Sequence, residues 1–161
     1  MPRADFSVAD DDRWMDAALA EARSAVAHGD VPIGAVVVHD GEIIGQGRNR
    51  REVDHDPTAH AEILALREAA ATLGRWRLDD CAMYVTLEPC AMCAGAAVLA
   101  RLALVVFAAP DEKAGAVRSV AELLDEPRLN HHPKWRLGVR REEAESLLSG
   151  FFADRRYDRR P

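Results

Sequence analysis

The sequence AMYVTLEPCAMC, residues 82–93, predicts a buried strand that leads directly into a helix. Residues 82–87 form a short apolar run, as strands in the interior of a sheet do, and Pro89 suits the first turn of a helix. Cys90 and Cys93 then fall in that first turn, so their thiols can converge on one point. Because the positive end of the helix dipole favours thiolate over thiol, the turn is suited to metal binding or thiol chemistry.

The residues before this stretch predict two helices and a hairpin. Apolar residues recur at helical spacing from Trp14 to Val26, and a His-Gly-Asp stop follows. Two strand-like runs, 34–39 and 42–47, flank Asp40-Gly41, a dipeptide that favours a type I′ turn. We expect Thr58 to cap a second helix whose apolar face runs to residue 73.

The residues after it predict two more strands and a closing helix. Residues 102–108 and 135–139 form strand-like runs, and the connection of about 25 residues between them suits parallel strands. That connection includes a helical pattern over 119–124, and residues 142–157 form an amphipathic closing helix. We therefore expect one domain over residues 1–161, an α/β three-layer α/β/α sandwich with one mixed five-stranded sheet.

Net charge, cysteine count and the lengths of the apolar stretches limit the kinds of protein that this chain can be. The chain has 161 residues, a net charge of −6 and three cysteines, an odd number that argues against a disulfide framework. No stretch has the length and apolarity of a signal peptide or a membrane span, so we expect a cytoplasmic protein without a membrane partner. Arginines are concentrated in residues 155–161. They form either a cationic surface that could bind a partner or the end of a helix, where positive charges offset the negative end of the macrodipole.

A second motif, His60-Ala61-Glu62, supplies what the two cysteines lack. A catalytic zinc site has three protein ligands and leaves the fourth position to water, and His60 with Cys90 and Cys93 matches that set. A carboxylate two positions from the histidine can reach the water without binding the metal. Glu62 is therefore the expected general base, because zinc lowers the pKa of its water to about 7.

Other uses of these residues remain open at this point. A lone Cys-x-x-Cys after a strand also suits a thioredoxin-like redox pair, and Cys81 could complete a purely structural zinc site. Neither use calls for a carboxylate beside His60. The joint pattern therefore favours hydrolysis assisted by a metal.

The two motifs together resemble the signature of the cytidine deaminase superfamily, whose members act on nucleobases. Within that superfamily the chain is similar to bacterial tRNA-specific adenosine deaminases. The likeness is carried by residues 57–63, by residues 86–96, and by Phe151-Phe152 followed by Arg155-Arg156.

The resemblance implies a cytidine deaminase-like fold, one zinc ion per chain and a homodimer. It implies hydrolytic deamination of adenosine to inosine at the wobble position of a tRNA anticodon, with a zinc-activated water and Glu62 as the proton shuttle. The partner is then the anticodon arm of a tRNA, and no DNA partner is expected. The substrate-binding residues that it implies are Asn49, Arg50, Ala61, Asp111, Asn130, His131, Phe151, Phe152, Arg155 and Arg156.

Two alternatives to this function remain open. A deaminase of a free base or nucleoside, such as guanine or cytosine, would share the zinc motif but has no evident need for Arg155 and Arg156. A redox or structural zinc protein would release no ammonia. Metal analysis combined with an ammonia assay separates these classes.

Overall fold

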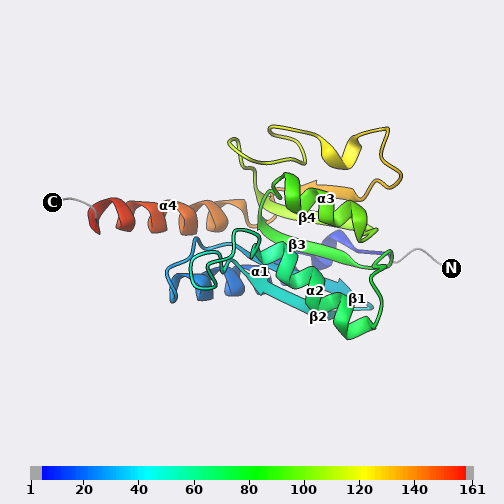
Figure 1. The fold of residues 1–161 in the computed structure, drawn as a ribbon, viewed down its shortest axis with the longest axis horizontal. Coiled ribbons are helices and arrows are strands. Elements are labelled where there is room, and N and C mark those ends of the chain that lie inside the picture. The colour runs from blue at the N-terminus through cyan, green and yellow to red at the C-terminus, as the bar shows by residue number, and fades with distance from the viewer. Residues whose placement is uncertain (1–4, 159–161) are drawn as a thin grey trace.

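A mixed sheet of five strands forms the centre of the computed structural model, which describes residues 5–158 (Figure 1). Strand β1 is antiparallel to both of its neighbours, whereas β3, β4 and β5 run parallel. The predicted mixed sheet is therefore confirmed. In spatial order its strands are β2 (Glu42–Arg48), β1 (Gly34–His39), β3 (Ala82–Leu87), β4 (Leu104–Ala109) and β5 (Lys134–Leu137).

Helices cover both faces of this sheet, as predicted. Alternate residues of β1 face opposite ways, so Val37 packs with α2 and α3 in one core while Val36 packs with α1 and the start of α4 in the other. The end of α4 projects beyond the body of the molecule (Figure 1). The helices are α1 (Asp11–Val26), preceded by the short η1 (Val8–Asp10), α2 (Ala61–Leu73), α3 (Ala91–Leu99) and α4 (Arg141–Asp158).

Local turn chemistry fixes the hairpin between β1 and β2. Asp40 and Gly41 have φ angles of 53° and 75°, the positive values that a type I′ turn needs at both central residues. The register shifts once, between Val37 and Val38. The predicted hairpin is confirmed.

Glycines in β2 let helix α2 lie directly on the sheet. A Cβ atom at Gly47 would stand 2.3 Å from the carbonyl oxygen of Ala61, and one at Gly45 would stand 2.3 Å from that of Ala65. Both distances are far below ordinary contact, so only glycine allows this approach. The first turn of α2, which contains Glu62, is thereby fixed against β2.

Two predictions about helices are wrong. His60, not Thr58, is the N-cap of α2, because Thr58 donates both its N–H and its hydroxyl to Asp56. Residues 119–124 form no α-helix: turns lead into the short η2 (Leu123–Asp125). A helix does not form there because the N–H of Leu123 donates to the carbonyl of Ala116 and not to that of Ser119, as an α-helix requires.

Over residues 5–158, each helix is too short or too polar to cross a membrane.

Candidate active site

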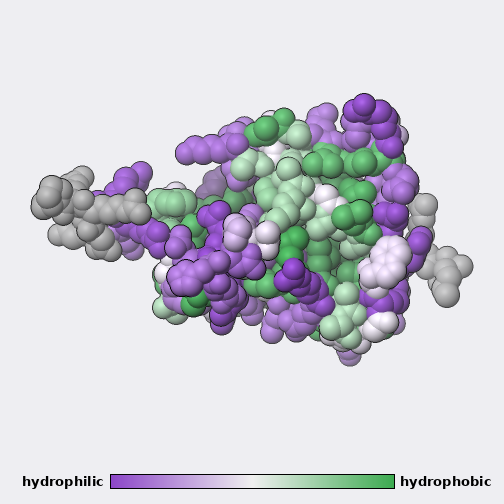
Figure 2. Space-filling model, viewed as in Figure 1, coloured by the Kyte–Doolittle hydropathy of each residue, from purple (hydrophilic) through white to green (hydrophobic). Residues whose placement is uncertain are grey.

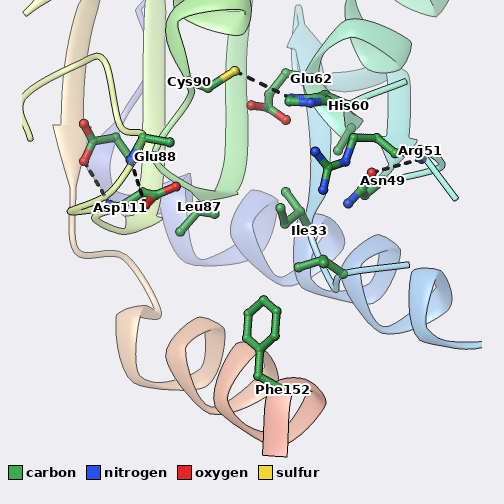
Figure 3. A pocket seen from close by; sticks show the side chains of 13 residues that line it. Ile33, Asn49, Arg51, His60, Glu62, Leu87, Glu88, Cys90, Asp111 and Phe152 are labelled. Atoms are coloured by element: carbon green, nitrogen blue, oxygen red, sulfur yellow. Dashed lines mark hydrogen bonds between the residues drawn. The ribbon is translucent and has the colours of Figure 1, made fainter. Parts of the chain in front are cut away.

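Four strand ends meet at one edge of the sheet and form a pocket there. Strands β3 and β4 are parallel and end at this edge, β2 also ends there, and β1 begins there. Ligand sites of open α/β sheets lie beyond such carboxyl ends. The cavity measures about 260 Å³. Its wall is formed by Val31, Ile33, Asn49, Arg51, His60, Ala61, Glu62, Leu87, Glu88, Cys90, Asp111, Ala114 and Phe152 (Figure 3).

The three predicted metal ligands come together at the inner end of this pocket. The Nδ1 atom of His60 lies 3.6 Å from the sulfur of Cys90 and 3.6 Å from that of Cys93, and all three donor atoms lie within 4.8 Å of one another. Tetrahedral zinc, with Zn–S near 2.3 Å and Zn–N near 2.0–2.1 Å, sets sulfur and nitrogen about 3.6 Å apart. The residues therefore fit a zinc ion.

The two thiols are electronically different. The pKa of Cys90 is lowered to about 3, first by the hydrogen bond from Cys93 and also by His60. The shared proton and burial raise the pKa of Cys93. Cys90 is also the N-cap of α3, where the helix dipole favours a thiolate. Cys90 is therefore the thiolate of the pair, and Cys93 holds the shared proton that a bound cation would displace.

Glu62 lies in the first turn of α2, beside the ligands, and its side chain faces the pocket (Figure 3). The residue is only 4% exposed, and burial raises the pKa of its carboxyl above the ordinary value. A carboxyl with a raised pKa can hold and release a proton nearer neutral pH. This is the position and the property that a general base needs.

Asn49 follows β2 and is buried in the pocket wall. Its Oδ1 accepts the backbone N–H of Arg51, which fixes the amide in place. Of the two neighbouring arginines, the structure places Arg51 on the wall. Arg50, the one that the resemblance implies, donates instead to Asp54 through two nitrogens.

The segment after β4, residues 110–119, closes the opposite wall. Asp111 and Ala114 line the pocket there, and the Asp111 carboxylate accepts the backbone N–H groups of Lys113 and Ala114. Buried Glu88 holds the segment at both ends. Burial alone would raise the pKa of Glu88, but hydrogen bonds from Arg118, Ser119 and Asp111 outweigh it and lower the pKa.

Helix α4 brings one of its two phenylalanines to the mouth of the pocket. Phe152 is 46% exposed and lines the cavity, whereas Phe151 is buried. Arg155 lies over the ring of Phe151 and donates to the carbonyl of Gly29, so it braces α4 against the end of α1. Arg156 is exposed. Arg159 and Arg160, which complete the basic stretch noted in the sequence, lie outside the described residues.

Asn130 and His131 do not reach this pocket within one chain. His131 donates from Nε2 to the carbonyl of Leu102, at 2.7 Å, just before the start of β4. That end of β4 is opposite to the edge at which the pocket lies. Asn130 is exposed beside it.

Cys81 stands apart from the metal ligands. It precedes β3, at the far end of the strand from Cys90, and its thiol contacts Asp80. Burial raises the pKa of the Cys81 thiol to about 12. Within the described part of the chain, Cys81 does not belong to the group that could hold a metal. A structural site completed by Cys81 is therefore not formed.

Two polar residues of this wall, Arg51 and Glu88, are not predicted as site residues from the sequence. A signal was present for each: an Arg-x-x-x-Asp spacing that pairs Arg50 with Asp54 and leaves Arg51 for the wall, and an acidic residue at the end of a buried strand, just before a proline.

The fold and the site together define a class, the zinc-type nucleobase deaminases, which join a His-x-Glu segment to a Pro-Cys-x-x-Cys segment at one pocket. The chain belongs to the MafB19-like deaminase family, whose sequence pattern matches residues 9–156. The resemblance drawn from the motifs is confirmed.

Three relatives show which kinds of deaminase this chain is similar to. The tRNA-specific adenosine deaminase of Aquifex aeolicus (strain VF5) is 50% identical over 139 residues, which cover 86% of this chain and 91% of that protein. A solved structure from a study of A-to-I editing by tRNA A34 deaminases at the wobble position has a TM-score of 0.82 and 43% identity, and the match covers 84% of this chain and 99% of that one. The guanine deaminase of Nitrosomonas europaea has a TM-score of 0.77 at 26% identity, over 95% of this chain and 88% of that one.

Proposed function

We propose that this protein converts adenosine to inosine by hydrolysis at the wobble position of a tRNA anticodon. The observation that carries the proposal is the placement of His60, Cys90 and Cys93 around one point, with the buried carboxyl of Glu62 beside them. The relative from Aquifex aeolicus at 50% identity is named for this activity. The guanine deaminase of Nitrosomonas europaea is less similar to this chain, at 26% identity.

Zinc held by His60, Cys90 and Cys93 would act as a Lewis acid and make a water molecule nucleophilic at neutral pH. Glu62 takes a proton from the attacking water and delivers it to the ring nitrogen next to C6. A second transfer through Glu62 brings a proton to the amino group, which leaves as ammonia. Adenosine and water are thereby converted to inosine and ammonia.

The pocket suits one base presented from a single-stranded loop. Its volume of about 260 Å³ lies just below the range of about 300–1,000 Å³ for small-molecule sites, so it admits a base and leaves the rest of the nucleic acid outside. The amide of Asn49 offers a donor and an acceptor to the edge of that base. Phe152 at the mouth offers a ring on which a neighbouring base can stack.

RNA binding would extend from the pocket to α4. Arg156 is exposed on that helix, and Arg155 lies one position before it. The chain carries a net charge of −6, so a polyanion can be attracted only by local cationic groups such as these. A tRNA substrate would also place the activity in the cytoplasm.

We further propose that the protein acts as a homodimer through the outer face of α2 and α3. Trp76 is 62% exposed and Leu99 is 70% exposed, and both line an apolar groove on this face. Figure 2 shows hydrophobic surface gathered over the two helices. Exposed apolar patches of this kind mark interaction sites, and a second copy of the chain would cover it with the same surface.

The substrate is tested by incubation of the purified protein with an anticodon stem-loop that carries adenosine at the wobble position. Free adenosine, cytidine and guanine are assayed in parallel for ammonia release. Inosine in the stem-loop with little turnover of the free compounds is expected. Rapid deamination of guanine with an unchanged stem-loop would replace this proposal by the free-base alternative.

A further inference from the structure

Glu88 is a buried carboxylate in the pocket wall, and neither metal binding nor proton transfer uses it. It lies between the end of β3 and the metal ligand Cys90. The hydrogen bonds of its carboxylate run to the segment after β4, residues 110–119, which we call the wall segment. Figure 3 shows Glu88 and Asp111 joined on the side of the pocket away from Asn49.

The contacts of Glu88 reach both ends of the wall segment. Its Oε2 accepts three successive backbone N–H groups, those of Val117, Arg118 and Ser119, at 3.0–3.2 Å. Its Oε1 accepts the backbone N–H of Asp111 at 3.1 Å and the hydroxyl of Ser119 at 2.5 Å. Successive N–H groups around an anion form a stable nest, so the carboxylate fixes the backbone at residues 117–119.

Gly115 shows how closely the wall segment wraps the carboxylate. A Cβ atom at this position would stand 2.2 Å from the carboxyl carbon of Glu88 and 2.3 Å from its Oε2. The segment is also tied to the metal-binding turn, because Ala116 donates to the carbonyl of Pro89 and Gly115 forms a bridge with Cys90. Only a residue without a side chain fits between these groups.

We propose that Glu88 is a positioning residue, whose carboxylate holds the wall segment in place so that Asp111 and Ala114 form the substrate wall opposite Asn49. The inference rests on the proposed function, because it assigns the wall to the binding of the RNA substrate. Glu88 acts through the wall segment and does not touch the reacting base. Its loss therefore raises KM more than it lowers kcat.

Glu88→Gln is the sharpest perturbation of this contact. The glutamine oxygen can still accept from residues 117–119, but its NH2 group then faces the N–H of Asp111, a donor facing a donor. The expected drop in kcat/KM on the stem-loop is about 10- to 100-fold, the range for one hydrogen bond to a charged group. Glu112→Gln is the matched control, because Glu112 is exposed on the same segment and loses the same charge.

Two measurements decide the role. Amide hydrogen exchange at residues 111–114 should become faster in Glu88→Gln and stay unchanged in Glu112→Gln. In a double-mutant cycle, Glu88→Gln should cost less kcat/KM in an Asp111→Ala background than in the wild type, since both act on one wall. Gly115→Ala places a Cβ atom against the Glu88 carboxylate, so it disturbs the same contact and should also raise KM.

Unchanged exchange at residues 111–114, or effects that simply add in the cycle, would overturn the positioning role. A wild-type protein that makes no inosine would overturn the proposed function instead. The exchange measurement needs no activity, so it would then decide by itself whether Glu88 holds the wall segment.

Discussion

The contact of Gly47 with helix α2 gives a prediction whose size follows from the structure. In Gly47→Ala the new Cβ would lie 2.3 Å from the carbonyl oxygen of Ala61, whereas ordinary contact begins at 3.4 Å. The helix or the strand must therefore move by about 1 Å, and a misplacement of this size can cost about 100-fold in rate. Glu62 follows Ala61 directly, so the displacement falls on the proton shuttle.

Overpacking of this kind costs about 1–3 kcal/mol of the free energy of unfolding, which lowers Tm by about 2–12 °C in a domain of this size. The assay combines thermal unfolding with kcat/KM on the stem-loop. Gly150→Ala is the matched control, because a Cβ there meets nothing within 4 Å and should stabilise the interior of α4 by about 0.5–1 kcal/mol. A Gly47→Ala protein with the Tm and kcat/KM of the wild type would refute the argument that β2 fixes the position of Glu62.

Three further predictions concern the metal, the RNA and the dimer. Cys81→Ser should leave the zinc content unchanged, and a zinc-free variant would mean that Cys81 is a ligand. Replacing Arg155 and Arg156 together by alanine should weaken binding of the stem-loop and lower the salt slope by about 0.7–0.9 for each phosphate that the protein no longer neutralises, while zinc stays bound; an unchanged affinity and slope would remove α4 from the RNA site. Leu99→Arg should give a monomer by sedimentation with a near-normal Tm, because this side chain is exposed within one chain; a dimer that persists would exclude this face as the interface.

The parts of the site that the sequence predicts are those set by local spacing. Cys90 and Cys93 converge because they share the first turn of one helix, and Glu62 lies near them because it is two residues from His60. The hairpin follows from Asp40-Gly41 alone. Each of these inferences needs only neighbouring residues, and each agrees with the structure.

The parts that the sequence does not predict depend on distant or competing partners. The helical pattern at 119–124 is overridden by turns, because the N–H of Leu123 donates to the carbonyl of Ala116, seven positions earlier, and not to that of Ser119. Arg51 replaces Arg50 on the pocket wall because Arg50 is bound to Asp54. Local propensity holds no information about a competing backbone acceptor such as the carbonyl of Ala116, whereas the spacing of Arg50 and Asp54 was a signal in the sequence.

In the proposed reaction, Glu62 moves protons at a zinc site that acts on a wobble adenosine. The most direct test measures zinc per chain and inosine formed in the stem-loop, side by side, for the wild type and for Glu62→Gln. We expect one zinc ion in both proteins, inosine with the wild type and almost none with the variant, since Glu62 is a proton carrier and not a ligand. Substantial inosine formation by Glu62→Gln, or the absence of zinc from that variant, would contradict the role assigned to Glu62.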